Sequence, residues 1–252
     1  MDPAIYGTYY RMERELWWFF ARQEIVFSFL EKLRPDLQQC KVLDIGTGTG
    51  SYLEEFHRRG IDAEGHDASE EAIAYLAKNP NNKIQKKNFP EDYLSETVRY
   101  DVVLMLDVLE HVQEDARGLE TALRLLKPGG VLVCTVPACK AMWGPYDIVS
   151  HHFRRYSRSE LKQLAEKFSG FKMVKLSYFN TLLFPLMYLV RVFENLKYQI
   201  TKKLTYEPHL VSGWLNQLLY KIFRLEKPIL HAVNLPYGSS LLMVLKKDGS
   251  KS

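Results

Sequence analysis

The chain has 252 residues and a mass of 29.4 kDa, and 46% of its residues are hydrophobic, 13% aromatic and 25% charged. This composition is typical of one globular domain, or of one domain with an insertion, and it excludes disordered, collagen-like and disulfide-rich proteins. The three cysteines, Cys40, Cys134 and Cys139, form no CxxC pair and indicate neither a disulfide framework nor a thiolate zinc site.

The net charge of +4 hides an asymmetry along the chain. Residues 1–138 carry 16 basic and 23 acidic side chains, whereas residues 139–252 carry 18 basic and 7 acidic ones, so the two parts have net charges of −7 and +11. A basic half can meet an anionic small molecule, a nucleic acid or an anionic membrane surface, or it can be a set of solvated helix faces.

Neither a secretory signal nor a spanning helix is expected. The N-terminus has no basic region followed by an apolar run. The uncharged apolar stretch at residues 176–190 is too short to cross a bilayer and contains Pro185. Together with the unpaired cysteines, these features favour a cytoplasmic protein.

The first element in chain order is an amphipathic helix. Between residues 8 and 33, apolar side chains recur at three- and four-residue spacings, and Pro35 marks the end of the pattern. The pattern predicts one helix over 8–33.

From Lys41 onwards, short apolar runs alternate with helical patterns. Helices are predicted near 50–59, 69–78 and 115–127. The predicted strands lie before, between and after these helices, at residues 41–46, 62–67, 83–88, 100–106, 130–137 and 171–179. Such alternation indicates βαβ units and a parallel sheet.

Two helix starts have recognisable caps. Ser69 is followed by two glutamates, which suit the positive end of a helix dipole. Ser157 with Glu160 three residues later is a capping-box pattern, and Gly170 is expected to close the segment that follows.

The chain is expected to divide into three parts. Residues 1–36 form an N-terminal cap helix, and residues 37–179 with 239–248 form the core. Residues 180–238 show apolar helical stretches interrupted by prolines, which predict a helical insertion or lid. The closing run, residues 241–247, is predicted to rejoin the sheet as the last strand.

The most informative segment is Val42-Leu43-Asp44-Ile45-Gly46-Thr47-Gly48-Thr49-Gly50, an apolar strand that enters a glycine turn. Glycines allow a tight turn and close approach of the backbone to a ligand. Asp67 lies 21 residues beyond Gly46, at the end of the next strand, where a carboxylate can accept hydrogen bonds from ribose hydroxyls.

The spacing of the turn favours a cationic nucleoside. Dinucleotide sites use GxGxxG, whereas this turn is GxGxG with Asp44 upstream, which would repel a diphosphate. S-adenosylmethionine fits, because its ribose suits Asp67 and its ammonium suits the neighbourhood of Asp44.

An ordered series of motifs extends this site over residues 10–180. The series reads VLDIGTGTG, GHDAS, KKNFPE, YDVVLMLDVLEHV, LLKPGGVLVCTVPA and HFRRYS. The chain thereby resembles class I S-adenosylmethionine-dependent methyltransferases of the small-molecule type that carry LEHV and KPGG motifs. The resemblance implies an α/β, Rossmann-like seven-stranded sheet of order 3-2-1-4-5-7-6, with the last strand antiparallel, an N-terminal helix and a helical insertion before the last strand.

The resemblance also implies a set of cofactor-binding residues. Asp44, Gly46, Gly48 and Gly50 would frame the methionine end of the cofactor. Asp67 would hold the ribose hydroxyls.

The remaining implied contacts come from four other places in the chain. Asn88 stands where relatives often have Asp and would bind the adenine amine, with Phe89 beside the ring. Leu106 and Asp107 would line the methionine portion. Arg22, in the N-terminal helix, would pair with the cofactor carboxylate, unless it is a surface arginine.

Two histidines are candidates for chemistry on the acceptor. Methyl transfer is an in-line displacement that depends on positioning, and a base is needed only if the acceptor must lose a proton. His152 and His111 follow strands at the edge where ligands gather, and either can accept a proton near neutral pH, although a structural role is also open. Arg154 and Arg155, with Tyr156, are candidates to bind an anionic group of the acceptor, or they are solvated. Metal binding is disfavoured, because no spaced His and carboxylate ligands are visible.

The acceptor is expected to be a small molecule and not a nucleic acid. The chain has LDVLEH after the fourth strand in place of the motif of nucleobase amino methyltransferases, and it shows no RNA-binding module. An apolar stripe on residues 214–223 with nearby lysine and arginine suits either core packing or an interfacial helix. This stripe and the basic C-terminal part suggest an apolar or anionic acceptor, such as a lipid-like, isoprenoid or glycan-linked molecule, with peripheral membrane contact through residues 180–233. Methylation of an oxygen atom is favoured over carbon or nitrogen, which stay open.

Two other functions stay open from the sequence. A protein that binds the cofactor without catalysis would keep the same turn. A nicotinamide-dependent oxidoreductase is the other alternative, although the GxGxG turn speaks against it. The sequence carries no indication of an oligomeric state.

Overall fold

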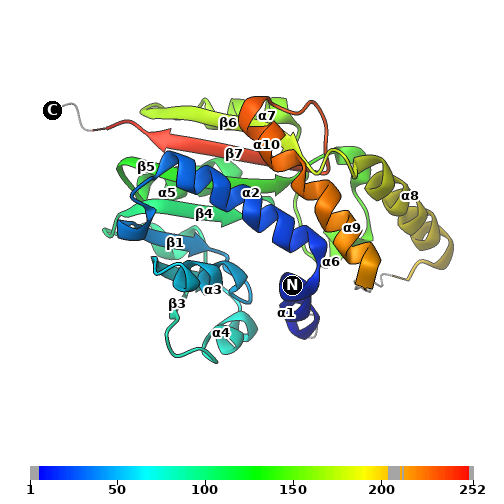
Figure 1. Cartoon of the computed structure of the whole chain (residues 1–252), viewed down its shortest axis with the longest axis horizontal. Coiled ribbons are helices and arrows are strands. Elements are labelled where there is room, and N and C mark those ends of the chain that lie inside the picture. The colour runs from blue at the N-terminus through cyan, green and yellow to red at the C-terminus, as the bar shows by residue number, and fades with distance from the viewer. Residues whose placement is uncertain (1–5, 204–210, 212, 250–252) are drawn as a thin grey trace.

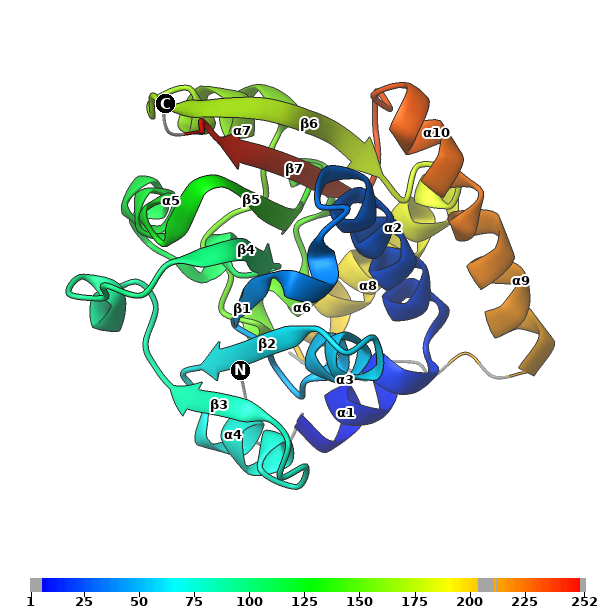
Figure 2. The same cartoon turned by 60° about the vertical axis from the view of Figure 1, so that its left-hand side comes forward.

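The computed structural model describes residues 6–203, 211 and 213–249, and its centre is a seven-stranded sheet (Figure 1). The order is β3-β2-β1-β4-β5-β7-β6, as Figure 2 shows, with β7 antiparallel to both neighbours. This confirms the predicted fold class and strand order. The strands are β1 (Lys41–Ile45), β2 (Asp62–Asp67), β3 (Lys83–Lys86), β4 (Tyr100–Leu106), β5 (Leu126–Pro137), β6 (Phe171–Phe179) and β7 (Ser240–Lys247).

The central strands are buried on both faces, as continuous apolar runs in a parallel sheet require. β1 lies between β2 and β4, with Asp44 opposite both Gly65 and Leu104. The strand order reverses between β1 and β4, and ligands bind at such switch points, outside the carboxyl ends of the strands.

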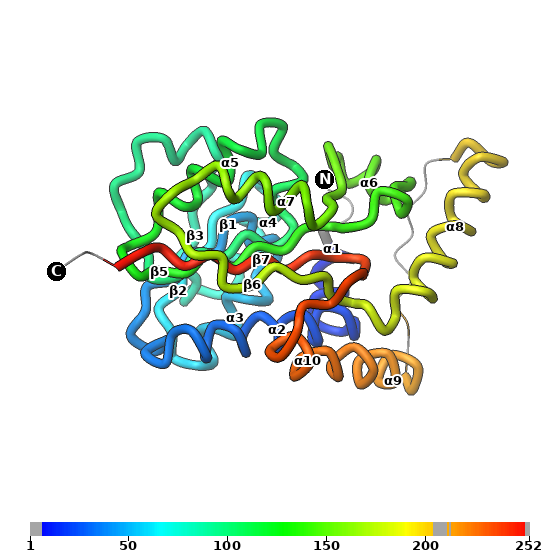
Figure 3. The backbone as a smooth tube through the Cα atoms, turned by 90° about the horizontal axis from the view of Figure 1, so that it is seen from above, coloured from blue at the N-terminus to red at the C-terminus, as the bar shows by residue number. Residues whose placement is uncertain are grey.

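Helices cover both faces of the sheet (Figure 3). One core cluster joins the sheet to α2 (Trp17–Leu33), α3 (Ser51–Arg58), α9 (Gly213–Arg224) and α10 (Glu226–Ala232). The other joins its opposite face to α5 (Asp115–Arg124) and α7 (Arg158–Ala165).

The prediction of one helix over 8–33 is wrong. Leu16 adopts an extended conformation, with φ −90° and ψ 133°, and separates α1 (Tyr6–Glu15) from α2. The break lets α2 pack along the sheet while α1 turns toward the glycine turn, where the Arg14 side chain donates to the Thr49 carbonyl oxygen at 3.1 Å. The three- and four-residue spacing of apolar side chains continues through Leu16 without a change, so this spacing did not indicate the break.

The prediction that a helix extends to residue 127 is also wrong. α5 ends at Arg124, because the chain already begins to pair with β4: the Tyr100 amide donates to the Leu125 carbonyl oxygen at 2.9 Å. Residues 127–130 therefore lie within β5. The two predicted caps are confirmed: Ser69 Oγ accepts from the Ala72 amide, at the start of α4 (Glu70–Leu76), and Ser157 with Glu160 forms a reciprocal capping box.

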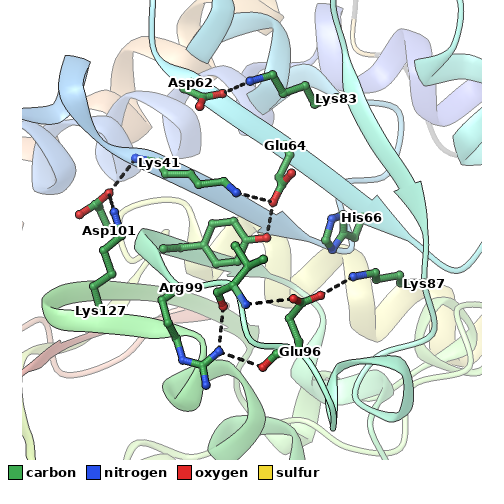
Figure 4. A network of polar contacts seen from close by, with 12 residues as sticks. Lys41, Asp62, Glu64, His66, Lys83, Lys87, Glu96, Arg99, Asp101 and Lys127 are labelled. Carbon is green, nitrogen blue, oxygen red and sulfur yellow. Dashed lines mark hydrogen bonds and ion pairs between the residues drawn. The ribbon is translucent and has the colours of Figure 1, made fainter.

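The amino ends of the strands are tied together by a network of polar contacts (Figure 4). Asp101, at the start of β4, accepts from the Lys41 amide at 2.9 Å and from Lys127 Nζ at 2.7 Å. Lys83, at the start of β3, pairs with Asp62, at the start of β2, at 2.6 Å. These contacts occupy the edge of the sheet opposite to the carboxyl ends.

Within residues 180–238, one helix packs on the core and another projects from it. α9 packs on α2: Asn216 Oδ1 accepts from the Trp17 amide at 2.8 Å, and the buried Phe223 ring lies 5.7 Å from that of Trp17 and 6.0 Å from that of Phe179. α8 (Phe184–Thr201) projects from the body of the molecule, and none of its side chains is buried (Figures 1 and 3).

α8 rests against α6 (Pro145–Val149) and the turn before it. Asn195 Nδ2 donates to the Trp143 carbonyl oxygen at 2.9 Å, and the Arg191 guanidinium lies 5.5 Å from the centre of the Tyr146 ring. Within the described part of the chain, no helix has the length and hydropathy needed to cross a membrane.

Candidate active site

A cavity of about 670 Å³ opens at the carboxyl ends of β1, β2 and β4. It brings together most of the residues that the sequence singled out. Those that line it are Arg22, Asp44, Gly46, Gly48, Asp67, Phe89, Leu106, Asp107, His111 and His152.

The glycine turn forms one wall of the cavity. Gly46 has a φ of +67°, and a Cβ there would lie 2.5 Å from a methyl carbon of Val108. Gly48 has a φ of +59°, and its amide donates to Asp67 Oδ2 at 2.9 Å. Only glycine combines this backbone with this close approach. The glycine turn therefore also fixes the position of the Asp67 carboxylate, through the amide of Gly48.

Asp67 is held from two sides. Its Oδ1 accepts from the Ser69 amide at 2.9 Å, while Oδ2 accepts from Gly48. Each carboxylate oxygen can accept a further hydrogen bond. Burial raises the pKa of Asp67, and the backbone amides oppose that rise.

Asp44, at the end of β1, is only 2% exposed. Burial raises its pKa to about 7, against the opposing hydrogen bond with Thr47 and with a further contribution from Glu13. A cationic ligand placed beside Asp44 would favour its ionised form.

Arg22 and Asp107 form an ion pair on the cavity wall. Asp107 follows β4 with a φ of +58°, and its other oxygen accepts from the Thr135 hydroxyl at 3.1 Å. The Arg22 guanidinium lies 4.3 Å from the centre of the Trp18 ring, and its Nε is buried without a hydrogen-bond partner in the described residues. A carboxylate entering the cavity could use this free donor.

His152 is oriented by a buried carboxylate. Its Nδ1 lies 2.9 Å from Asp147 Oδ1, which also accepts from Arg155 Nε at 2.8 Å, while Oδ2 accepts from the Gly144 amide at 2.9 Å. Burial opposes ionisation of Asp147, but the hydrogen bond with His152 and the charge of Arg155 outweigh it and lower the pKa. Nδ1 of His152 is thus the protonated nitrogen, and Nε2 is available as an acceptor.

His111 lies beside His152, with ring centroids 4.7 Å apart and planes at 85°. Burial lowers the pKa of His111 to about 4, with a further contribution from His152, so the imidazole is neutral near pH 7.

The sequence did not single out Glu110. Its side chain is completely buried, and neither carboxylate oxygen has a hydrogen-bond partner among the described residues. Burial, reinforced by Asp107, raises the pKa of Glu110 well above its usual range.

Other cavity residues were also missed. Tyr9 and Glu13 come from α1, and Tyr146 comes from α6. Glu13 accepts a hydrogen bond from the Thr49 hydroxyl, and a Cβ at Gly48 would lie 3.1 Å from its Oε1. No local pattern marks these residues, because they reach the cavity only through the break at Leu16 and the short helix α6. His66 also lines the cavity and was not predicted. Its position directly before Asp67, at the end of a predicted strand, could have identified it.

Two residues expected at the cofactor do not line the cavity. Gly50 caps α3 with a φ of +90°, and a Cβ there would meet a methyl carbon of Leu76 at 2.3 Å. Asn88 is exposed, and its backbone amide donates to Asp92 at 2.7 Å. Both residues shape neighbouring backbone, and the adjacent Phe89 does line the cavity.

The three residues expected to bind the acceptor line a separate, smaller hollow of about 250 Å³. Arg154 pairs with Asp115 at 2.8 Å, and the Tyr156 hydroxyl donates to the same carboxylate at 3.0 Å. Arg155 is buried and holds Asp147. Arg155 therefore contacts the cavity only through Asp147 and His152.

A methyltransferase domain family matches residues 18–176, which is more than half of the chain. Among curated proteins, the ubiquinone biosynthesis O-methyltransferase of Cereibacter sphaeroides (strain ATCC 17025) is 37% identical over 122 residues, covering 46% of this chain and 49% of that protein. The enzyme of the same name from Psychrobacter cryohalolentis is 34% identical over 100 residues, covering 37% and 39%. The chain thus spans about half the length, or less, of the curated relatives it matches.

Solved structures share the fold. A SAM-dependent methyltransferase from Archaeoglobus fulgidus superposes with a TM-score of 0.54 at 20% identity, covering 89% of this chain and 94% of the other. The plantazolicin methyltransferase BpumL, solved with a desmethylPZN analog and SAH, gives 0.58 at 17% identity, with coverages of 96% and 90%.

Proposed function

Because the chain belongs to the class I S-adenosylmethionine-dependent methyltransferase family, we propose that it transfers the methyl group of S-adenosylmethionine to an oxygen atom of an apolar or anionic small molecule. The proposal rests on one observation: Asp44, Asp67, the Arg22–Asp107 pair and two histidines line the same cavity.

The residues of the cavity fit the cofactor. Asp67 is fixed by two amides and keeps acceptor capacity for ribose hydroxyls. The unpartnered Nε of Arg22 suits the carboxylate of the methionine portion, and Asp44 suits its ammonium group. A Cβ at Gly46 or Gly48 would press on Val108 or Glu13, which line the same cavity, so glycine at both positions keeps the cavity wall in place.

The histidine side of the cavity suits the acceptor. When bound, the cofactor supplies an activated methyl group: the acceptor oxygen bonds to its carbon while the carbon–sulfur bond breaks, with the electron pair left on sulfur. His152 and His111 are proposed to bind the acceptor hydroxyl, and Nε2 of His152 is proposed to take its proton, because Asp147 occupies Nδ1. Oxygen is favoured over nitrogen and carbon by the names of the curated relatives.

Methyl transfer is tested with radiolabelled S-adenosylmethionine and phenolic acceptors, with and without an isoprenoid tail. We expect labelled product with the tailed phenol, and loss of S-adenosylmethionine binding in Asp67→Ala. Binding of S-adenosylmethionine without a product from these acceptors or from a lipid extract would favour a non-catalytic binding protein instead.

The proposed apolar acceptor suggests contact with an anionic membrane surface through residues 180–233. The exposed face of α8 carries apolar side chains at helical spacing: Leu186, Leu189, Val190, Phe193, Leu196 and Ile200. Phe193 is 68% exposed, and Trp214 on α9 is 74% exposed. Such a stripe can enter the interfacial region of a bilayer.

Charge and position support the same proposal. Lys197, Lys202 and Lys203 are exposed at the end of α8, where they can meet anionic lipid headgroups. Both α8 and α9 lie at the end of the molecule to which the carboxyl ends of the parallel strands point (Figure 1). An acceptor leaving the bilayer would therefore reach the cavity by a short path.

Vesicle flotation tests this contact. We expect co-flotation with phosphatidylglycerol-containing vesicles at low salt, weakened about tenfold by Phe193→Asp. The matched control is Leu94→Asp, since Leu94 is an exposed leucine between β3 and β4. Equal flotation of all three proteins, or none of the unaltered protein, would contradict the membrane proposal.

A further inference from the structure

One peptide group joins α8 to the carboxylate that orients His152. The Trp143 carbonyl oxygen accepts from Asn195 Nδ2, on α8, at 2.9 Å. The Gly144 amide, which belongs to the same peptide group, donates to Asp147 Oδ2 at 2.9 Å. We infer that Asn195 is a positioning residue for His152, and that α8 thereby acts on the proton transfer in the cavity.

The geometry of the peptide group transmits the contact. The Trp143–Gly144 peptide bond is trans, and a trans peptide group is planar, so the direction of its carbonyl bond fixes the direction of its N–H bond. A rotation that breaks the hydrogen bond from Asn195 also turns the amide away from Asp147. The contact with α8 therefore keeps the amide in line with the Asp147 carboxylate.

Gly144, at the N-cap of α6, lies directly against α8. A Cβ at Gly144 would lie 2.4 Å from Asn195 Oδ1 and 3.1 Å from Arg191 Cδ. Glycine also has more backbone freedom than any other residue, so a contact from outside is needed to keep this peptide group in one orientation. The glycine thus admits the Asn195 side chain and leaves a peptide group that Asn195 holds.

Asp147 transmits the position of the amide to the imidazole. It is completely buried, and its Oδ1 lies 2.9 Å from His152 Nδ1 and 2.8 Å from Arg155 Nε. A buried carboxylate depends on the donors around it, so loss of the Gly144 amide would let the carboxylate turn toward other partners. The hydrogen bond at Nδ1 sets the tautomer of His152 and the direction of Nε2.

A second contact from α8 reaches the same imidazole. Arg191 lies one turn before Asn195, on the same side of α8, and its guanidinium is 5.5 Å from the centre of the Tyr146 ring, within the range of a cation–π contact. The Tyr146 ring packs edge-on against His152, with centroids 5.6 Å apart and planes at 90°. Two neighbouring side chains of α8 therefore act on His152 through α6.

α8 can be altered without disturbing the core, because none of its side chains is buried. Asn195 also lies outside the lining of the cavity. Its substitution should leave the fold and the affinity for S-adenosylmethionine unchanged while it loosens His152. The inference rests on the proposed function where that function makes His152 the base, but the hold on the imidazole can be measured without methyl transfer.

The proton on His152 Nδ1 reports this hold directly. In NMR spectra of protein with isotopically labelled histidine, a proton bonded to a buried carboxylate exchanges slowly with water, and loss of the signal in His152→Ala assigns it. We expect exchange to become about tenfold faster in Asn195→Ala. Asn195→Asp should act in the same way, because it keeps the shape of the side chain and has no N–H to donate.

Gln199→Ala is the matched control. Gln199 is exposed and lies one turn beyond Asn195 on the same helix, so the substitution removes a similar amide group. It should change the exchange rate by less than about twofold.

Kinetics with a soluble phenol and no lipid give a second measurement. We expect kcat to fall about tenfold in Asn195→Ala, because the proton acceptor is misplaced, while KM for S-adenosylmethionine changes by less than about twofold. Gln199→Ala should keep both constants.

The outcomes separate this inference from the proposed function. Faster exchange in both Asn195 variants, and not in Gln199→Ala, supports the positioning role even if no acceptor is methylated. Unchanged exchange in Asn195→Ala, equal acceleration in Gln199→Ala, or no slowly exchanging Nδ1 proton in the unaltered protein overturns it. Faster exchange with an unchanged kcat overturns it as well. Circular dichroism confirms that the variants are folded, and Gly144→Ala, whose Cβ would displace Asn195, provides an independent variant that should also accelerate exchange.

Discussion

Arg22, in the middle of α2, forms an ion pair with Asp107, directly after β4, and so joins the N-terminal helix to the cavity wall. Their separation in sequence is 85 residues. The pair places a cation and an anion where the two charged ends of a methionine portion would bind.

Arg22→Met should weaken S-adenosylmethionine binding 10- to 100-fold, because it removes both the ion pair and the free Nε donor. Stability should fall by about 2 kcal/mol, less than the roughly 3–5 kcal/mol for breaking a fully buried pair, since the Asp107 side chain is 28% exposed. Calorimetry and urea unfolding measure the two effects. Arg34→Met, which removes an ion pair with Asp36 away from the cavity, should leave affinity unchanged.

Asp44 should make stability depend on pH. Its pKa of about 7 in the folded chain lies above that of an unfolded aspartate, so the folded state binds more protons between about pH 4 and 7. The cost of ionising Asp44 is absent below that window and complete above pH 7, so the free energy of unfolding falls as pH rises through it.

Asp44→Asn removes this cost and should stabilise the ligand-free protein by about 1–4 kcal/mol at pH 8, and by less at pH 5. Urea unfolding at both pH values measures the change. The same substitution should weaken S-adenosylmethionine binding. A stability gain that is equal at pH 5 and pH 8 would refute the role of ionisation.

Gly46→Ala should lower stability more than its backbone conformation alone requires. A left-handed non-glycine residue costs about 1–2 kcal/mol, and the clash with Val108 adds to this. Gly60→Ala is the control, because Gly60 has a φ of +71° with nothing within 4 Å of an added Cβ. Calorimetry should show S-adenosylmethionine binding abolished in the first variant and intact in the second. Equal thermal stability of the two would contradict the close contact.

Phe223→Ala tests whether α9 belongs to the core. The Phe223 ring is fully buried between Trp17 and Phe179, so its removal should cost about 3–5 kcal/mol. Leu218→Ala, on the exposed side of the same helix, should change stability by less than about 0.5 kcal/mol. Denaturant unfolding distinguishes this packing from a loosely attached lid, for which both substitutions would be nearly neutral.

The sequence by itself determined the sheet and the glycine-turn wall of the cavity. Apolar runs of strand length, alternating with capped helices, have few ways to pack, and Asp44, Gly46, Gly48 and Asp67 occupy strand ends that meet at one edge. Parallel strands end at the same edge of a sheet, and this rule applies both to the sequence pattern of these residues and to their final positions. The predicted strand order and the position of these four residues on one cavity therefore agree with the structure.

Tertiary structure alone decided the opposite side of the cavity. Glu110 came to lie beside His152, and Asp147 came to hold that ring, because the chain returns to Glu110 after α6, where the Phe153 amide donates to the Glu110 carbonyl oxygen at 2.8 Å. The break at Leu16 likewise brought Glu13 to the glycine turn. Such contacts join chain segments that are far apart in sequence. Neither apolar spacing nor a short motif encodes the distances between these side chains or their burial, and distance and burial determine the charge state of each side chain.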